Sequence, residues 1–275
     1  MTEIGEYFVN KCLAATTIKD PWPYTQFADG LPTDSFNKLK KSIENIDEER
    51  LIVEQTVDSD KKTFTKDDFP TLKEFNDVNS VWRQRHLPSD DPNEIMGGQF
   101  GRWVKRKHTK RDGLYPTYLY PGQWKEYGID FEDEMRSIGK AVLDNARDLC
   151  NKFPKYKWYH KLGLNVHIKV DPPKPFSYYV HADSPDKIWT SVIYISPDEN
   201  IGTQLYTGRE NDKSIEEKNY TLVKELPWKP NNHFVFCSDP QRSYHNYRNN
   251  MPKNRFTLCM FVGRFKENAG YYYNN

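Results

Sequence analysis

Hydrophobic positions in the first part of the chain recur at helical spacing. The first such set contains three residues at intervals of three and four: Phe36, Leu39 and Ile43. Thr33 and Asp34 come just before this set, and either side chain can cap the N-terminus of a helix. A short extended piece, Trp22 to Phe27, precedes the helix. The pattern predicts a helix with one apolar face, preceded by a strand.

A longer helix is predicted in the stretch GIDFEDEMRSIGKAVLDNARDLCNKF. Asp130 can serve as its N-cap, and acidic residues fill the first turn, where they favour the helix dipole. The predicted buried stripe consists of Phe131, Met135, Ile138, Val142 and Leu149. Lys152 lies at the end of the stretch, where a cation is favourable.

From about Lys155 onward the pattern changes to short β-type runs separated by Pro, Asn, Asp and Gly. In LGLNVHIKV the apolar residues alternate and share one face: Leu162, Leu164, Val166, Ile168 and Val170. The other runs are FSYYVHAD, IWTSVIYIS, TQLYTG, YTLVKEL, HFVFCS and RFTLCMFVG. Seven short strands with turn signals between them predict a sandwich, barrel or jelly roll. Because the helices come first, we expect an α+β, mainly β fold: a jelly roll with helices against one sheet.

The chain is long enough for one large or two small domains, and we expect a single domain over residues 1–275. Its predicted parts are a first strand and helix (1–57), an irregular insert (58–127), the buttress helix (128–153) and a jelly-roll core with the functional site (162–263). The insert is polar, weakly periodic and rich in Pro, Gly and Trp, and for that reason we expect it to wrap around the main domain.

Composition narrows the class of protein. The net charge of the 275 residues is only +1, which favours neither a dedicated nucleic-acid binder nor a membrane-surface protein. No apolar run approaches the roughly 18 residues needed to span a bilayer, and the N-terminus has no apolar core typical of a secretion signal. The scattered cysteines are Cys12, Cys150, Cys237 and Cys259, and this pattern suits free thiols in a reducing compartment. We therefore expect a soluble cytoplasmic protein with no membrane partner.

Two histidines and one aspartate form the leading candidate for a metal site. In a strand, His181 and Asp183 project to the same side, about 6.6 Å apart at Cα. A third ligand should come from a neighbouring strand, and His245, 62 residues after Asp183, is the best candidate. Two His and one carboxylate on one face form the facial triad of non-heme Fe(II) oxygenases. Either piece alone is weak evidence, because short motifs of this kind also occur by chance at strand edges.

Arg255 strengthens this interpretation. It opens RFTLCMFVG, a run that is apolar on one face and largely apolar on the other, so the strand is expected to be buried on both faces. A buried arginine needs an anionic partner. The nearby sequence offers no carboxylate in obvious register, so the partner is either a distant carboxylate or that of a small molecule. Thr257 faces the same way and can add a hydroxyl hydrogen bond.

The order His181-x-Asp183, His245, Arg255 resembles the Fe(II)/2-oxoglutarate-dependent dioxygenase family, and most closely its prolyl-hydroxylase-like branch. Three further stretches resemble that branch: TSVIYIS after the metal-site strand, GTQLY in place of a Gly-Gly-x-Leu hairpin, and FCSDPQRSYH before the distal histidine. The resemblance covers roughly Pro21 to Ile43 and Leu162 to Gly263. Thr203 and Asn232 stand where this branch usually has glycine.

The resemblance implies a double-stranded β-helix (jelly-roll) core and a hydroxylase. His181, Asp183 and His245 would hold Fe(II) as the catalytic centre. Four residues would bind 2-oxoglutarate: Arg255 and Tyr194 at its distal carboxylate, with Thr257 and Thr190 beside them. The implied reaction converts the cosubstrate 2-oxoglutarate and O2 to succinate and CO2, with ascorbate as an optional cofactor.

The sequence leaves the substrate open, and a rival class remains. A protein prolyl residue fits the resemblance, and a nucleic acid or free small molecule fits almost as well. The basic stretch Arg102 to Arg111 could track a phosphate backbone, but such a run is more often a solvated loop. The rival is a non-catalytic jelly-roll binding module. His233 is expected to be structural, and the loop Gly208 to Tyr220 is either a lid or an ordinary exposed loop.

Overall fold

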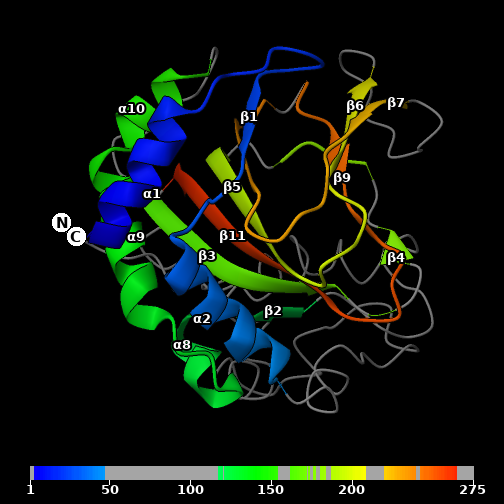
Figure 1. Cartoon of the computed structure of the whole chain (residues 1–275). Coiled ribbons are helices and arrows are strands. Elements are labelled where there is room, and N and C mark those ends of the chain that lie inside the picture. Colours follow the sequence, from blue (N-terminus) through cyan, green and yellow to red (C-terminus); the bar gives the residue numbers. More distant parts are fainter. Residues whose placement is uncertain are drawn as a thin grey trace, which may run out of the picture.

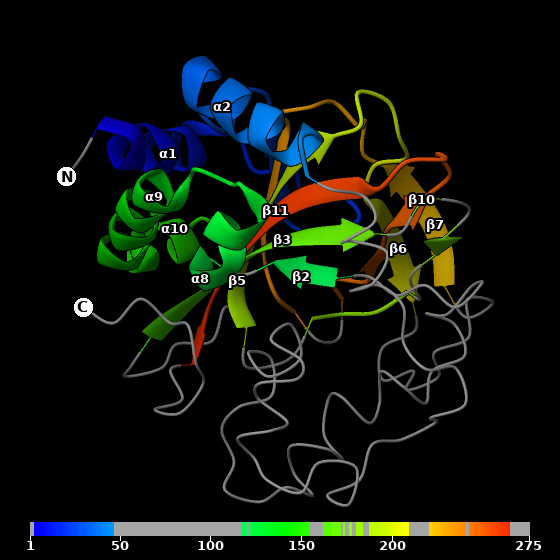
Figure 2. The ribbon, with the colours of Figure 1, turned by 90° about the horizontal axis from the view of Figure 1, so that it is seen from below.

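The protein is mainly β, with a few helices gathered on one side. The computed structural model describes residues 3–46, 117–119, 121–153, 162–171, 173, 176–177, 180–183, 187–208, 220–239 and 242–264. Figure 1 shows the helices beside a large sheet, with the smaller strands on the other side of that sheet. Figure 2, turned by 90°, shows the same separation.

The large sheet has six strands in the order β1-β8-β5-β11-β3-β2, and every neighbouring pair is antiparallel. Their bounds are β1 (Tyr24–Phe27), β8 (His233–Cys237), β5 (Lys187–Ser196), β11 (Arg255–Arg264), β3 (Leu162–Asp171) and β2 (Thr117–Leu119). The three longest strands, β5, β11 and β3, lie side by side. This arrangement joins segments that are far apart in the sequence.

Two smaller sheets complete the described β structure. One has the order β7-β6-β9 and the other pairs β10 with β4, all antiparallel. Their bounds are β7 (Tyr220–Glu225), β6 (Gln204–Gly208), β9 (His245–Asn246), β10 (Arg248–Asn249) and β4 (Phe176–Ser177). An isolated antiparallel bridge also pairs His181 with His245. The seven predicted runs therefore each contain strand structure, although the run FSYYVHAD keeps only β4 and this bridge among its described residues.

The helices cover one face of the large sheet (Figure 1). They are α1 (Glu3–Ala14), α2 (Thr33–Glu44), α8 (Pro121–Trp124), the 3-10 helix η3 (Lys125–Tyr127), α9 (Glu132–Asp144) and α10 (Ala146–Asn151). The predicted caps were wrong: Pro32 and Phe131 hold the N-cap positions of α2 and α9, and neither helix has a side-chain cap. Asp130 lies one residue before the N-cap of α9 and pairs with Lys38 at 3.1 Å.

The main core lies between the helices and the sheet. The predicted stripe of α9 and α10 is buried, as is the apolar face of α2. The alternating face of β3 is buried from Leu164 to Val170, and Leu162 packs against the same core. Periodicity thus identified the buried faces correctly.

Helix α1 was not predicted, although it belongs to this core. Gly5 brings it close to α9, since a Cβ at this position would lie 2.8 Å from the Ser137 carbonyl oxygen. At the other end of α1, Lys152 donates to the carbonyl oxygens of Cys12 (2.8 Å) and Ala15 (2.6 Å). Lys152 therefore satisfies the last carbonyls of a helix distant in sequence.

Part of the predicted irregular insert can be compared with the structure. Residues 117–119 and 121–127 are regular and form β2, α8 and η3. Residues 58–116, which include the basic stretch Arg102 to Arg111, lie outside the described residues, as do residues 209–219 of the predicted loop. None of the helices in the described ranges is long and apolar enough to cross a membrane.

The face of the large sheet that points away from the helices is unusually polar. Alternation places these side chains on it from β3, β5 and β11: Asn165, His167, Lys169, Asp171, Thr190, Tyr194, Arg255, Thr257 and Cys259. Most of them are buried. Buried polar groups require partners, so this inner face is where a ligand or a polar network is expected.

Candidate metal centre

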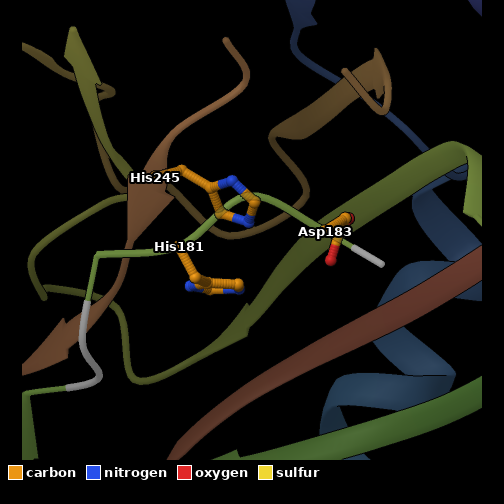
Figure 3. Close-up of side chains that lie close together, drawn as sticks. All are labelled: His181, Asp183 and His245. Carbon is orange, nitrogen blue, oxygen red and sulfur yellow. The ribbon is translucent and has the colours of Figure 1, made fainter. Parts of the chain in front are cut away.

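Three side chains converge beside the inner face. The ligating atoms of His181, Asp183 and His245 all lie within 4.8 Å of one another. Figure 3 shows the two imidazoles and the carboxylate facing a common point. The grouping comes from two segments, one after β4 and the other in β9, which are far apart in the sequence.

Backbone pairing holds the two histidines side by side. The His181 amide donates to the His245 carbonyl at 3.0 Å, and the His245 amide donates to the His181 carbonyl at 2.8 Å. Because this is a paired position of an antiparallel bridge, both side chains leave the backbone on the same side. Their ring centroids are 4.4 Å apart.

The ring of His245 has a defined orientation. Its Nδ1 lies 2.8 Å from the Ser243 carbonyl oxygen. Since a carbonyl oxygen only accepts, Nδ1 carries the proton and Nε2 keeps a free lone pair. Burial lowers the pKa of His245 further than the nearby Asp183 carboxylate raises it, so the imidazole is held neutral. A neutral imidazole is the form that binds a metal.

Asp183 is held at both oxygens. Lys187 Nζ lies 2.7 Å from Oδ1, and Thr190 Oγ1 donates to Oδ2 at 2.8 Å. Burial alone would raise the pKa of Asp183, but the charge and the hydrogen bond of Lys187 hold it well below its usual range. The carboxylate is therefore ionised and oriented, as a metal ligand needs to be.

Lys187 was missed by the sequence analysis. Besides its contact with Asp183, its ammonium lies 3.6 Å from the centroid of the Phe261 ring. No spacing rule separates this lysine from the others in the chain. It could be found only from the strand register, which places Gly263 opposite Lys187 and so brings the start of β5 beside the end of β11.

Arg255 is buried on the inner face, and its partner was also missed. Its Nη1 donates to Asp171 Oδ2 at 2.7 Å, and Lys169 Nζ lies 2.8 Å from Asp171 Oδ1. Asp171 is directly opposite Arg255 in the β3–β11 register, so a distant carboxylate does supply a partner. Arg255 Nε is nevertheless buried without a hydrogen-bond partner among the described residues.

Tyr194 and Thr203, near Arg255, are joined by two hydrogen bonds. The Tyr194 hydroxyl donates to Thr203 Oγ1 and accepts from the Thr203 amide, both at 2.9 Å. The Tyr194 ring stacks on Trp228 at 4.4 Å, and its centroid is 5.8 Å from Arg255 Cζ. The threonine that departs from the hairpin pattern thus anchors this tyrosine.

The other predicted cosubstrate residues lie on the same face with different contacts. Thr190 donates to Asp183, as described above, and Thr257 Oγ1 lies 3.6 Å from Cys259 Sγ. The residue with positive φ before β8 is Asn231 (φ 65), the neighbour of Asn232. Its amide group is bonded to the backbone of Leu31, with Oδ1 accepting and Nδ2 donating, both at 2.9 Å.

Two other histidines lie apart from the triad. His233 faces the helices and has its Nε2 2.6 Å from Ser191 Oγ. His167 faces inward, where Tyr118 and Phe261 contact its ring.

No protein-family model and no curated protein matches this chain. Among solved structures, a prolyl hydroxylase from Trichoplax adhaerens, in complex with a peptide fragment of the hypoxia inducible factor oxygen degradation domain, aligns at 11% identity with a TM-score of 0.46. That alignment covers 94% of this chain and 88% of the other. A prolyl-4-hydroxylase from Pseudomonas putida aligns at 13% identity with a TM-score of 0.38, covering 94% and 98%.

A third solved structure is a viral collagen prolyl hydroxylase from Paramecium bursaria Chlorella virus-1, in its 2-oxoglutarate complex. It aligns at 13% identity with a TM-score of 0.33, over 55% of this chain and 80% of the other. Identities this low and TM-scores below 0.5 assign no function. The chemistry has to be inferred from the residues themselves.

Proposed function

We propose that this protein is an Fe(II)/2-oxoglutarate-dependent oxygenase that hydroxylates its substrate. One observation carries the proposal: the ligating atoms of His181, Asp183 and His245 lie within 4.8 Å of one another. Two imidazoles and one carboxylate are the donor set of the facial triad that binds non-heme Fe(II). The proposal includes a double-stranded β-helix (jelly-roll) core in which the six-stranded sheet faces the smaller strands.

The three residues fit a divalent metal in their protonation states as well as in their spacing. His245 presents Nε2 because Ser243 holds its Nδ1 proton, and Asp183 is ionised. Lys187 compensates the charge of the carboxylate, and Thr190 donates a hydrogen bond to its other oxygen. In the proposed enzyme these two residues would keep the carboxylate oriented for the metal that His181, Asp183 and His245 would hold.

The inner face supplies groups for the cosubstrate. We assign Arg255 to the distal carboxylate of 2-oxoglutarate, because its Nε is buried and has no hydrogen-bond partner in the described part of the chain. Tyr194 and Thr257 flank it, since Thr257 lies opposite Tyr194 in the β5–β11 register. Arg255 binds the ligand by charge-assisted hydrogen bonds, and Tyr194 limits where the ligand can lie.

Bound Fe(II) with 2-oxoglutarate and O2 supplies the oxidation of a C–H bond, with release of succinate and CO2. The protein binds and orients the reactants and shields them from water. The buried rings of Trp22 and Phe236, which pack against His245, contribute to that shielding.

The substrate class stays a proposal. A prolyl residue of a protein fits the sequence resemblance, while nucleic acid and a free small molecule are the alternatives. The basic stretch Arg102 to Arg111, which would favour nucleic acid, is outside the described residues. A non-catalytic binding module is the rival class, and it predicts a folded protein that forms no succinate.

Anaerobic titration with Fe(II) and 2-oxoglutarate tests the proposal. The weak visible charge-transfer band expected of this site should appear only when both are present, and admission of O2 with a suitable substrate should yield succinate. His181→Ala should abolish the band, because two ligands hold a divalent metal far less tightly than three. His167→Asn is the matched control, since His167 is a histidine on the inner face outside the triad.

The enzyme assignment fails if well-folded protein gives neither the band nor succinate. Intact activity in His181→Ala would overturn the ligand assignment alone. Turnover-coupled screening of peptides, free amino acids and single-stranded nucleic acids then distinguishes the substrate classes, because decarboxylation without a substrate does not identify one.

A further inference from the structure

Lys169, Asp171 and Arg255 form a buried charge cluster at one end of the inner face. Asp171 is fully buried, and Lys169 and Arg255 are 5% and 2% exposed. Asp171 Oδ2 lies 2.7 Å from Arg255 Nη1, and Asp171 Oδ1 lies 2.8 Å from Lys169 Nζ. The strand register enforces this order, because Asp171 and Lys169 lie opposite Arg255 and Thr257 in β11.

Two cationic groups share one carboxylate in this cluster. An uncompensated positive charge is costly in a buried site. Burial lowers the pKa of Lys169 to about 7, although Asp171 acts in the opposite direction. The lysine is therefore partly deprotonated near neutral pH, which reduces the buried positive charge. Arg255 keeps its charge throughout. Near neutral pH the net charge of the three groups therefore lies between zero and +1, so the cluster does not repel a further anion.

The guanidinium of Arg255 is fixed on two sides. Asp171 holds Nη1, and the ring of Trp228 covers one face, with its centroid 4.7 Å from Cζ. Trp228 is itself held by a 2.7 Å hydrogen bond from its Nε1 to the Pro197 carbonyl oxygen. Among the described residues the Nε atom has no hydrogen-bond partner, and in the planar guanidinium it lies on the edge away from Nη1. A carboxylate of a ligand can accept a hydrogen bond from the N–H group of Nε on that edge of the guanidinium.

We propose that Asp171 is a positioning residue, held in turn by Lys169, that turns the Nε edge of Arg255 toward the carboxylate of the ligand. This inference rests on the proposed function and deepens it, because it concerns how the distal carboxylate of 2-oxoglutarate is recognised. Fixing the guanidinium before the ligand arrives lowers the ordering cost of binding. The alternative is a structural ion pair that only neutralises Arg255.

Calorimetric titration of Mn(II)-loaded protein separates these two roles without turnover. The probes are 2-oxoglutarate and 2-oxobutanoate, which has the same 2-oxo acid group but no distal carboxylate. Wild-type protein should prefer 2-oxoglutarate. Asp171→Asn should weaken 2-oxoglutarate binding about tenfold, as the loss of one charge-assisted hydrogen bond would, and leave 2-oxobutanoate binding nearly unchanged. A structural ion pair would change both ligands alike or neither.

Lys169→Met provides a second variant, because Asp171→Asn leaves Arg255 buried without its counter-ion and can fail to fold. This variant keeps the Asp171–Arg255 pair and should also reduce the preference for 2-oxoglutarate. Lys140→Met is the matched control, since Lys140 pairs with Asp144 at 2.7 Å on the exposed side of α9. Mn(II) affinity should stay within about twofold in all three variants.

The outcomes distinguish the inference from the proposed function. Unchanged or tighter 2-oxoglutarate binding in folded Asp171→Asn, or an unchanged preference in Lys169→Met, overturns the positioning role and leaves the function standing. Wild-type protein that binds Mn(II) without preferring 2-oxoglutarate overturns the role of Arg255 together with this inference. Wild-type protein that binds no Mn(II) contradicts the proposed function itself.

Discussion

At the scale of single residues, the proposed metal site would depend on groups that are not themselves ligands. Thr190 and Lys187 each hold one oxygen of Asp183, and Ser243 holds Nδ1 of His245. Such partners fix the orientation of the ligands before a metal binds. Their loss typically lowers metal affinity by about tenfold or more. Of these three, only Thr190 was singled out by sequence, and in a different role.

Thr190→Val should weaken metal binding. The change keeps the shape of the side chain and removes the 2.8 Å hydrogen bond to Asp183 Oδ2, so one oxygen of the ligand loses its orienting donor. We expect Mn(II) affinity, measured by titration without cosubstrate, to fall about tenfold. Thr257→Val is the control, because Thr257 is a buried threonine on the same face that contacts Cys259. Equal affinities for the two variants would contradict the orienting role.

The sequence predicted the three residues that converge better than the groups around them. His181 and Asp183 were paired on the expectation of a strand, although His181 lies in an isolated bridge and Asp183 lies in no strand; His245 was added from the order of residue types. Asp171 could not be assigned to Arg255, because the two are 84 residues apart and only the β3–β11 register joins them. Register between distant strands is a property of the packed sheet, which local patterns do not specify.

At the scale of elements, periodicity predicted the buried faces of the helices correctly, but it did not predict where the helices begin and end. The stripe of α9 and α10 was correct, but the helix breaks at Asn145, whose side chain donates to the Ala141 carbonyl at 2.9 Å. Asparagine competes for backbone groups in this way, and this explains the interruption. Helix α1 shows a recognisable signal in retrospect, since its buried residues Gly5, Phe8, Val9 and Cys12 lie at helical spacing.

Gly5→Ala should destabilise the contact between α1 and α9. A Cβ at this position would lie 2.8 Å from the Ser137 carbonyl oxygen and 3.0 Å from the Ala141 Cβ, so one helix has to shift. We expect the free energy of unfolding in urea to fall by about 1–3 kcal/mol, in spite of the better helix propensity of alanine. Asn10→Ala, on the exposed side of α1, should change it by less than about 0.5 kcal/mol. A Gly5→Ala protein more stable than wild type would mean that the helices have room to adjust.

At the scale of the whole molecule, His233 joins the helices to the sheet. It is fully buried, its ring contacts Phe8 of α1 and Phe27 of β1, and its Nε2 meets Ser191 of β5. Burial lowers its pKa to about 3 from an ordinary value of 6.5. A protonated His233 would place an unpaired charge between these layers.

Stability should therefore fall as the pH is lowered. Between pH 6.5 and pH 3 the unfolded chain binds a proton that the folded protein excludes, so the free energy of unfolding decreases with decreasing pH. The contribution of this one residue is about 1.4 kcal/mol per pH unit within that window. His233→Gln lowers stability at neutral pH but should reduce the slope, as urea unfolding at several pH values would reveal. Identical slopes in the two proteins would exclude His233 as the cause.

The bridge between His181 and His245 also has a consequence for the order in which the protein is assembled. The two residues are 64 positions apart in the sequence. Their rings come close together only when the chain has closed the loop between them. Pairings of such long sequence separation form slowly, because the intervening loop has to close first, and the proposed triad is complete only after that closure. Metal binding should thus follow folding. The rate at which newly made protein binds metal should therefore equal the rate at which the pairing of His181 with His245 forms.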